Sequence, residues 1–425
     1  MKILLIGSGG REHAFAYKIS ESKLCDKLFI MPGNPGTAMH GTNVKGDSND
    51  FSEVGAFCDE NKIDLVIVGP EEPLVKGIRD HFSADEKLRS IGFIGPDKIG
   101  AQLEGSKDFS KAFMKKYKIP AASYKTFEKE NISEGIEYVK NHSLPVVLKA
   151  DGLAAGKGVL ICETNEEAVA ELRSMISEKK FGDASSKVVV EEFLKGIELS
   201  VFVLSDGNKY KILPSAKDYK RIGEGDTGLN TGGTGAVSPV PFAEENFMKK
   251  VEDRIIKPTI YGLKNENINY VGFIFIGLMK VGDDPFVIEY NCRMGDPETE
   301  VVLPRIKSDF VELMKACAEG KLNEYKLEVD ERCAATVMLV SKGYPGEYEK
   351  EKIIFGAEAC ENSIVFHSGT KRNDKNELVT NGGRVMAITS FGNDLQEAVS
   401  QSIKNAKKIS FEGKYFRRDI GYEFL

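Results

Sequence analysis

The first hundred residues alternate short apolar runs with amphipathic stretches. The apolar runs predict strands at residues 2–6, 28–31, 65–68 and 91–94, and helical patterns at 11–20 and 51–61 lie between them. Strands that alternate with helices are typical of a parallel sheet with crossover helices. Polar loops rich in glycine or proline follow three of the strands, at 7–12, 32–36 and 69–73. Because ligands bind at the carboxyl ends of such strands, we expect an α/β substrate-binding domain over residues 1–104.

The pattern changes after residue 104. The elements predicted next are helices at 106–117 and 165–177 and strands at 146–149, 188–190, 199–204, 273–279 and 286–291. We expect these to form a domain over 105–330 that carries a small α+β lid at about 123–193. Strands at 334–340, 364–367 and 383–390 and a helix at 394–409 then predict an antiparallel α+β domain over 331–425. The fold class we expect is therefore a multidomain α/β and α+β protein, which suits a chain of 425 residues.

Composition narrows the class of function. The chain has 58 basic and 65 acidic residues, a net charge of −7, which argues against a protein that binds nucleic acid by neutralising phosphates. Its apolar runs are far shorter than the ~20 residues of a membrane helix, and the first run is a buried strand rather than a signal peptide. Seven cysteines without a C-x-x-C pair indicate reduced thiols. We expect a cytoplasmic protein with small-molecule substrates and no nucleic-acid or membrane partner.

The strongest chemical signal lies at the end of the strand predicted at 286–291. Alternate residues of a strand share a face, so Glu289, Asn291 and Arg293 line up on one side. Their neighbours Ile288, Tyr290 and Cys292 are expected to pack on the other side. A carboxylate and an amide oxygen at this spacing suit Mg²⁺, and the Arg293 fork suits a carboxylate or phosphate. An exposed edge-strand face is the alternative.

Two lysines stand where a phosphate group could bind. Lys149 ends a buried strand and is followed by a loop of small residues, 150–158. Lys107 falls in the first turn of a helix that Ser106 caps, where a cation lowers helix stability unless it meets an anion. The loop lacks the Walker sequence because Lys157 is followed by glycine. An ordinary hairpin at Lys149 and a solvated surface lysine at Lys107 are the alternatives.

The loop after the first strand is a second candidate for an anion site. Bare backbone N–H groups at Gly9 and Gly10 precede a helix, and Arg11 at the helix start favours an anionic ligand. Glu12 stands where the dinucleotide fingerprint has its last glycine, which speaks against an NAD-dependent dehydrogenase. A tight turn without a ligand is the alternative.

Two further segments have charged side chains where parts of a nucleotide could bind. Glu191 and Glu192 end the strand at 188–190, and the apolar pair that follows would suit an adenine base, with Glu198 near its ribose. A turn between domains accounts for these residues equally well. The glycine-rich segment 223–235 follows three cations, Lys217, Lys220 and Arg221, and could close over a phosphoryl group, or be a plain loop. None of the five histidines has a partner at catalytic spacing.

Six motifs together resemble the ATP-grasp ligases, most closely the phosphoribosylamine–glycine ligase family of purine biosynthesis. They are the segments 7–14, 33–36, 69–74, 149–159, 230–236 and 289–299, of which the last (Glu-Tyr-Asn-Cys-Arg-Met-Gly-Asp-Pro-Glu-Thr) is nearly diagnostic. The resemblance covers almost the whole chain. It implies a pre-ATP-grasp domain, an ATP-grasp domain with its lid, and a C-terminal domain.

The resemblance also assigns roles to single residues. Those implied to bind ATP are Lys107, Lys149, Gly156, Lys157, Glu192, Leu194 and Glu198, and those implied to hold Mg²⁺ or Mn²⁺ are Glu289 and Asn291. Arg293 is implied to grip the glycine carboxylate, with Asp218 near the amino group; Lys149 and Arg293 are the catalytic pair. Those implied on the phosphoribosylamine side are Gly9, Gly10, Arg11, Asn34 and Gly36.

The implied reaction joins glycine to 5-phosphoribosylamine through a glycyl phosphate, with ATP converted to ADP and phosphate. The family pattern differs at one point: many ATP-grasp enzymes carry another acid on the strand at 273–277, which here has none. We expect a monomer. An ATP-grasp ligase with another acceptor and a nucleotide-binding regulator without activity are the competing hypotheses.

Overall fold

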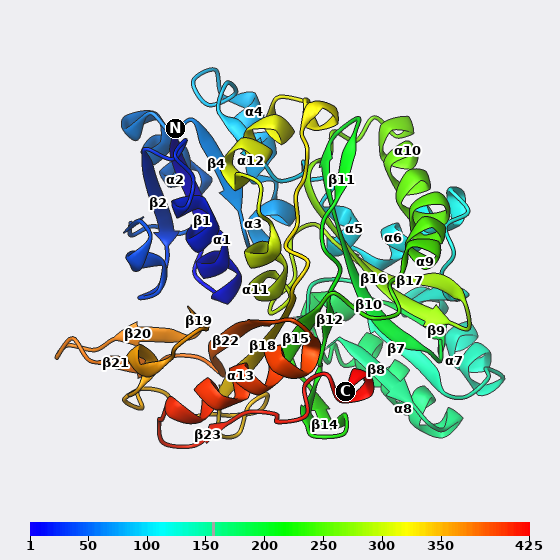
Figure 1. Cartoon of the computed structure of the whole chain (residues 1–425). Helices are drawn as coiled ribbons and strands as arrows, with labels where there is room; N and C mark the ends of the chain where they lie inside the picture. The colour runs from blue at the N-terminus through cyan, green and yellow to red at the C-terminus, as the bar shows by residue number, and fades with distance from the viewer. Residues whose placement is uncertain (155–157) are drawn as a thin grey trace.

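The computed structural model describes residues 1–154 and 158–425. Its N-terminal part is a parallel five-stranded sheet in the order β3-β2-β1-β4-β5 (Figure 1). The strands are β1 (Lys2–Gly7), β2 (Lys27–Pro32), β3 (Thr42–Asn43), β4 (Leu65–Val68) and β5 (Gly92–Ile94). Four of the five confirm strands expected from the sequence, and only the short β3 was missed. The crossover helices are α1 (Gly10–Ser20), α2 (Phe51–Asn61), α3 (Glu71–Lys76) and α4 (Ile78–Ala84).

The lid is an antiparallel sheet in the order β6-β9-β7-β8 with two helices on it. Its elements are β6 (Tyr124–Glu128), α7 (Ile132–Lys140), β7 (Val146–Ala150), β8 (Val159–Cys162), α8 (Asn165–Ser177) and β9 (Lys187–Glu192). Side chains such as Phe127, Val139 and Leu172 give it a hydrophobic core of its own. The lid is therefore packed as a separate body, the teal and green lobe at the lower right of Figure 1.

A second antiparallel sheet, β11-β10-β16-β17, lies between the lid and the N-terminal sheet. Its strands are β10 (Ile197–Asp206), β11 (Tyr210–Ile212), β16 (Val271–Val281) and β17 (Asp284–Asn291), and the helices α5 (Gln102–Gly105), α6 (Lys107–Lys116), α9 (Glu245–Val251), α10 (Lys257–Asn265), α11 (Thr299–Val302) and α12 (Phe310–Ala318) surround it. The backbone N–H of Gly95 bonds to Val271 O at 2.9 Å, and the apolar cores of the two sheets are continuous. The N-terminal sheet is thus fixed to the central one.

The C-terminal sheet is antiparallel and takes in two strands from earlier in the chain. Its order is β12-β15-β18-β22-β19, with β23 (Lys414–Tyr415) beside β18. The later strands are β18 (Cys333–Ser341), β19 (Ile364–His367) and β22 (Arg384–Gly392), covered by α13 (Leu395–Lys408), whereas β12 (Lys217–Asp218) and β15 (Gly235–Ser238) come from before residue 330. A small hairpin, β20 (Thr370–Arg372) and β21 (Leu378–Thr380), projects from it (Figure 1).

These sheets confirm the expected fold class, a parallel α/β part followed by antiparallel α+β parts. The expectation of a plain loop at 223–235 is wrong. The strands β13 (Arg221–Gly223) and β14 (Thr227–Asn230) pair as a hairpin there. The seven cysteines, all within the described residues, are free thiols. Every helix that the structure describes is too short or too polar to cross a membrane.

Phe15 of α1 tests how strongly the N-terminal domain depends on the central one. Its ring lies 5.6 Å from that of Phe273 on β16 and 5.8 Å from that of Phe310 on α12. We predict that Phe15→Ala lowers the free energy of unfolding by about 3–5 kcal/mol because it opens a cavity among buried side chains. Urea unfolding would measure this loss. The exposed Met39 provides the control, since Met39→Ala should change the same quantity by less than about 0.5 kcal/mol; equal effects would contradict the prediction.

Candidate active site

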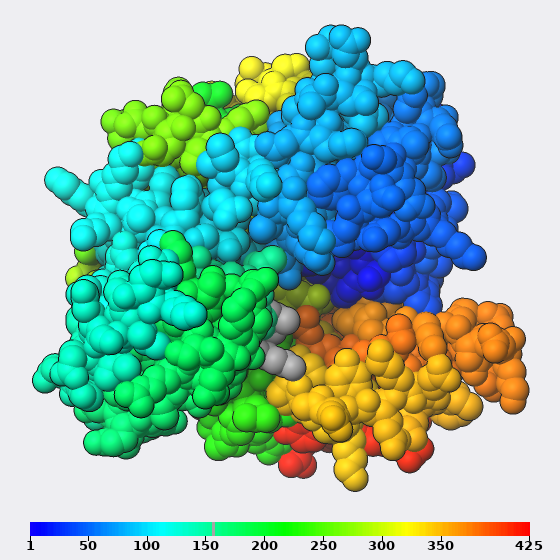
Figure 2. Space-filling model, turned by 180° about the vertical axis from the view of Figure 1, so that it is seen from behind, coloured from blue at the N-terminus to red at the C-terminus, as the bar shows by residue number. Residues whose placement is uncertain are grey.

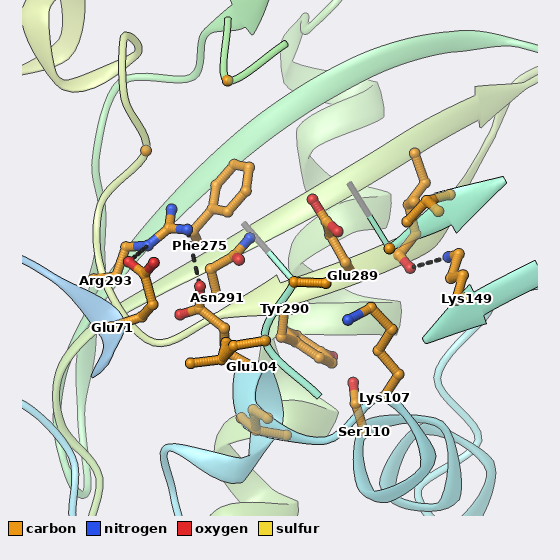
Figure 3. Close-up of a pocket in the computed structure, with 18 of the residues that line it drawn as sticks. Glu71, Glu104, Lys107, Ser110, Lys149, Phe275, Glu289, Tyr290, Asn291 and Arg293 are labelled. Carbon is orange, nitrogen blue, oxygen red and sulfur yellow. Dashed lines mark hydrogen bonds and ion pairs between the residues drawn. The ribbon is translucent and has the colours of Figure 1, made fainter. Parts of the chain in front are cut away.

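A cleft lies where the N-terminal, central and lid parts meet, and the surface is hollowed there (Figure 2). Most of the residues that line it come from α3, α5 and α6, from the lid strands β7 and β9, and from β17 with the turn that follows. Figure 3 shows how their polar side chains converge. The cleft therefore gathers residues that are far apart in the sequence.

Glu289 and Asn291 of β17 point into the cleft from one side of the strand, and the ring of Tyr290, which also borders the cleft, points the other way (Figure 3). Tyr290 is buried, and its hydroxyl lies 2.7 Å from that of Thr259. The residue opposite Glu289 on β16 is Gly277, so the neighbouring strand leaves room beside the carboxylate. The expected shared face of Glu289 and Asn291 is confirmed.

The expectation for Ile288 is wrong. The pairing of β16 with β17 shifts between Gly277 and Leu278, which pair with Glu289 and Val287, so Ile288 is an extra residue in a β-bulge. The bulge interrupts strict alternation, and Ile288 lines the cleft instead of packing behind it. Its carbonyl oxygen accepts a hydrogen bond from Lys149 Nζ at 3.2 Å.

Three lysines surround the Glu289 carboxylate. Burial opposes its ionisation, but the ammonium groups of Lys220, Lys149 and Lys107 lower the pKa of Glu289 below its usual value. The pKa of Lys107 is itself lowered by burial, although Glu289 counteracts this. The cleft thus holds an anionic carboxylate within a group of cations.

Lys107 is placed by the start of α6. Ser106 Oγ accepts the Phe109 N–H at 3.1 Å, which confirms the expected cap. Asp151, at the end of β7, accepts the Asp108 N–H at 2.7 Å and bonds to Ser106 Oγ at 3.0 Å. These bonds tie the lid to the helix, and Lys107 Nζ lies 3.4 Å from Gly152 O.

Lys149 is held by Glu191, a carboxylate that the sequence had placed near an adenine base instead. Glu191 Oε2 lies 3.0 Å from Lys149 Nζ and 2.9 Å from Lys111 Nζ, and all three residues are buried. Burial lowers the pKa of Lys111, and Glu191 opposes that change. The other oxygen, Glu191 Oε1, is buried and has no hydrogen-bond partner among the described residues.

The predicted adenosine contacts lie near this pair. Glu192 accepts the Ser123 N–H at 2.8 Å, Glu198 pairs with Lys220 at 2.7 Å, and Leu194 is half-buried after β9. In the described part of the chain, the lining of the cleft includes Glu191 but not these three residues. Two other predicted ATP contacts, Gly156 and Lys157, lie outside the described residues. All five roles remain predictions.

Arg293 follows β17 and lies between two carboxylates (Figure 3). Its Nη2 donates to Glu104 Oε1 at 2.8 Å, and its Nε lies 3.4 Å from Glu71 Oε2. Glu104 comes from α5 and Glu71 from the N-terminal domain. The guanidinium is therefore at the junction of three segments.

Asp218, on β12, also lines the cleft, as Lys220 and Glu298 do. Burial raises the pKa of Asp218, and its neighbour Glu198 adds to this while Lys220 opposes it. Burial and the nearby Asp218 also raise the pKa of Glu298 to about 7. Glu298 can therefore hold a proton near neutral pH.

The three cations before the glycine-rich hairpin all have partners. Lys217 Nζ pairs with Glu423 at 2.7 Å, Lys220 pairs with Glu198, and Arg221 donates to Gly228 O at 2.8 Å. Of these cations, Lys220 lines the cleft, together with Thr231 and Gly232 at the end of the hairpin. Closure of the hairpin over a phosphoryl group is therefore not needed to bring Lys220 to the site.

Glu12 organises the first loop. It accepts the Gly9 N–H at 2.6 Å, and Arg11 Nε donates to its other oxygen at 2.7 Å. Arg11 also donates to Met294 O at 3.2 Å and is buried. Gly7 has φ +126°, and a Cβ there would collide with Glu12. Arg11 thus meets its anion inside the protein, and its contact with a substrate remains a prediction, as does that of Gly9.

Asn34 joins the N-terminal and C-terminal parts. Its Nδ2 donates to Ser8 O at 2.8 Å and to His367 O at 2.9 Å, and its Oδ1 accepts the Gly36 N–H at 2.7 Å. A Cβ at Gly36 would collide with the ring of His13. The amide of Asn34 is engaged within the protein, so substrate contacts of Asn34 and Gly36 also remain predictions. Gly10 faces the side chains of Ser368 and of the buried Glu300.

Two curated relatives match the chain along its whole length. A phosphoribosylamine–glycine ligase from Yersinia pestis is 44% identical over 430 residues, covering 100% of this chain and 99% of the relative. One from Agrobacterium fabrum is 45% identical over 426 residues, with the same coverage. The chain belongs to the phosphoribosylamine–glycine ligase family.

Family models and a solved structure agree with this assignment. The N domain, ATP-grasp (A) domain and C domain of phosphoribosylglycinamide synthetase match residues 1–104, 105–299 and 334–423. The crystal structure of the phosphoribosylamine–glycine ligase from Thermotoga maritima has a TM-score of 0.86 and 36% identity, covering 99% of this chain and 100% of that one. The protein is therefore a ligase with the ATP-grasp fold.

Sequence reasoning missed several charged residues of this ligase. They are Glu71, Glu104 and Lys111, each of which lines the cleft. Glu191 and Lys220 also line it, but the sequence pointed to them only as an acid on the adenine side and as one of three cations before the hairpin. For Glu191 the sequence showed the correct strand end but not its lysine partners. The sequence signal for Glu104 and Lys111 was weaker. Each is a charged residue about one helical turn away from Lys107, Glu104 before it and Lys111 after it.

The histidines at the junction of the ligase's N- and C-terminal domains make its stability depend on pH. Burial lowers the pKa of His367 to about 4, and burial with its neighbours His367 and His40 lowers that of His13 well below its usual value. Between pH 6.5 and 4 the unfolded chain therefore binds more protons. We predict that acidification over this range removes about 3 kcal/mol of the free energy of unfolding through His367 alone.

Urea unfolding between pH 7 and pH 4.5 would test this. His367→Gln should show a shallower loss of stability with acidification than the unaltered protein. His142→Gln, which lies in the lid, should keep the full slope. Identical slopes for all three proteins would show that the histidine junction does not sense pH.

Proposed function

We propose that this ligase joins glycine to 5-phosphoribosylamine, converting ATP to ADP and phosphate and forming glycinamide ribonucleotide. The observation that carries the proposal is the convergence of Glu289 and Asn291 with Lys107 and Lys149, next to Arg293, in one cleft. Oxygen ligands, phosphate-binding cations and a carboxylate-binding fork are the groups that this chemistry requires. The names of the full-length relatives support the same reaction.

Glu289 and Asn291 fit a divalent cation, Mg²⁺ or Mn²⁺. Both supply oxygen atoms, and the neighbouring lysines lower the pKa of Glu289, which keeps it anionic. Among the described residues there is no cluster of three or more His, Cys, Asp or Glu side chains that would hold a metal by itself. This suits Mg²⁺, which takes its remaining ligands from phosphates and water. When bound, the ion would neutralise part of the phosphate charge.

The first step is attack of a glycine carboxylate oxygen on the γ-phosphorus of ATP. A P–O bond to glycine forms, the P–O bond to ADP breaks, and glycyl phosphate results. Arg293 would orient the carboxylate, and Asp218 would accept a hydrogen bond from the glycine amino group. Lys149 and Lys107 would neutralise the charge on the transferred group, so catalysis rests on positioning and electrostatics.

In the second step the amine of phosphoribosylamine attacks the glycyl carbonyl carbon. A C–N bond forms, the C–O bond to phosphate breaks, and the proton lost by the amine leaves with phosphate or water. The N-terminal residues Gly9, Gly10, Arg11, Asn34 and Gly36 would form the acceptor side. Exclusion of water matters here because glycyl phosphate hydrolyses readily.

The nucleotide would bind between the lid and α6. We assign Glu192, Leu194 and Glu198 to the adenosine, and Gly156 and Lys157 to the flap over the phosphates. The separate core of the lid supports closure over ATP as one body. The free thiols suit a reducing compartment, so we propose a cytoplasmic location, and we propose that the enzyme acts as a monomer.

Substrate omission tests the reaction. We predict that ADP release requires both glycine and phosphoribosylamine, because glycyl phosphate forms only with glycine and turns over only with the acceptor. A coupled ADP assay with each substrate left out in turn would measure this. Full turnover without glycine, or with a different amine in place of phosphoribosylamine, would instead indicate an ATP-grasp ligase with another substrate.

Replacement of Glu289 tests the metal site. We predict that Glu289→Gln lowers kcat by at least about 10²-fold, because it removes the carboxylate by which β17 lines the cleft while keeping the side chain's shape. Steady-state kinetics across a Mg²⁺ titration would show the loss. Circular dichroism should show an unaltered fold, and activity close to that of the unaltered enzyme would contradict the metal role.

A further inference from the structure

Glu104 is a buried carboxylate whose hydrogen bonds all go to the residues that follow β17. Its Oε2 accepts the backbone N–H of Cys292 at 2.8 Å and the Cys292 Sγ–H at 3.1 Å. Its Oε1 accepts Arg293 Nη2 at 2.8 Å. Both oxygens thus hold one short stretch of chain that is 188 and 189 residues away in sequence.

The setting of Glu104 makes this contact specific. Its side chain is 6% exposed, and burial raises the pKa of the carboxyl, an effect that Glu71 increases and Arg293 opposes. A buried carboxylate is tolerated only where it is paired and hydrogen-bonded. Glu104 and Arg293 therefore depend on each other for their charge balance.

This pairing fixes the orientation of the Arg293 guanidinium. Nη2 is bound to Glu104, and Nη1 donates to Met294 O at 3.2 Å. Nε is buried beside Glu71 Oε2, 3.4 Å away, and has no hydrogen-bond partner among the described residues. The bonds to Glu104 and Met294 use one N–H of each Nη group and leave the second N–H of each available to a ligand. A planar fork held at both Nη groups presents its remaining N–H donors in a fixed direction.

We propose that Glu104 is a positioning residue for the amino-acid carboxylate, acting through Arg293. This inference rests on the proposed function, in which Arg293 binds glycine. Glu104 sets the plane of the guanidinium so that the second N–H groups of Nη1 and Nη2 meet the incoming carboxylate. Because α5 leads through Ser106 directly into Lys107, the same short segment also supports a phosphate-binding lysine.

Glu104→Gln tests the proposal because it keeps the size of the side chain and removes its charge. We expect the KM for glycine to rise about 10–100-fold, the range seen when a residue that orients a ligand-binding group is replaced. The KM for ATP should stay unchanged. Glu104→Asp, which keeps the charge, should restore part of the glycine affinity and serves as a second variant if the glutamine variant folds poorly.

A buried carboxylate away from the cleft provides the matched control. Asp206, at the end of β10, accepts the backbone N–H groups of Asn208 at 2.9 Å and Lys209 at 2.6 Å. Asp206→Asn should lower the thermal midpoint but leave the KM for glycine unchanged. This separates a general loss of stability from a change in positioning.

A double-mutant cycle shows whether Glu104 acts through Arg293. Calorimetric titration with glycine in the presence of a non-hydrolysable ATP analogue would measure binding to Arg293→Lys with and without Glu104→Gln. We expect the second substitution to add little once Arg293 is replaced. Full additivity would overturn the proposal, as would an unchanged glycine KM in Glu104→Gln. If the unaltered enzyme does not require glycine at all, the proposed function itself is wrong.

Discussion

The active-site cleft depends on the balance of buried charge. Lys107, Lys149 and Lys220 gather around Glu289 in a setting where each isolated charge would be costly. Each lysine is tolerated because a carboxylate lies close to it, and the carboxylate stays ionised because of the lysines. A polyanionic substrate would add negative charge where cations are already collected, so the protein is organised before the substrate binds. This arrangement links stability and catalysis in the same residues.

Several carboxylates of the site hold other residues in place, in addition to the one proposed to bind the metal. Glu12 holds the first loop and Arg11, Glu191 holds Lys149, and Glu104 holds Arg293. In each case an acidic side chain beside a glycine-rich loop or strand end satisfies donors of the protein itself. Groups that contact the substrates can then keep one orientation, which is what catalysis by positioning requires.

The domains are joined by strands and side chains that cross their boundaries. The C-terminal sheet contains β12 and β15, so Asp218 on β12 belongs both to that sheet and to the cleft. Asn34 connects the first loop to His367, and the core under Phe15 connects α1 to the central sheet. The lid has a core built entirely from its own residues, which fits the part of the molecule expected to open and close.

The sequence by itself determined the local elements, the family and the face of β17, because apolar periodicity, the Ser106 cap and the motif at 289–299 are properties of short segments. It could not determine the bulge at Ile288, which depends on how β17 registers against β16. Nor could it pair Glu104 with Arg293, since the docking of separate segments brings them together across 189 positions. Local patterns specify which faces are buried, whereas only tertiary packing decides which charges meet.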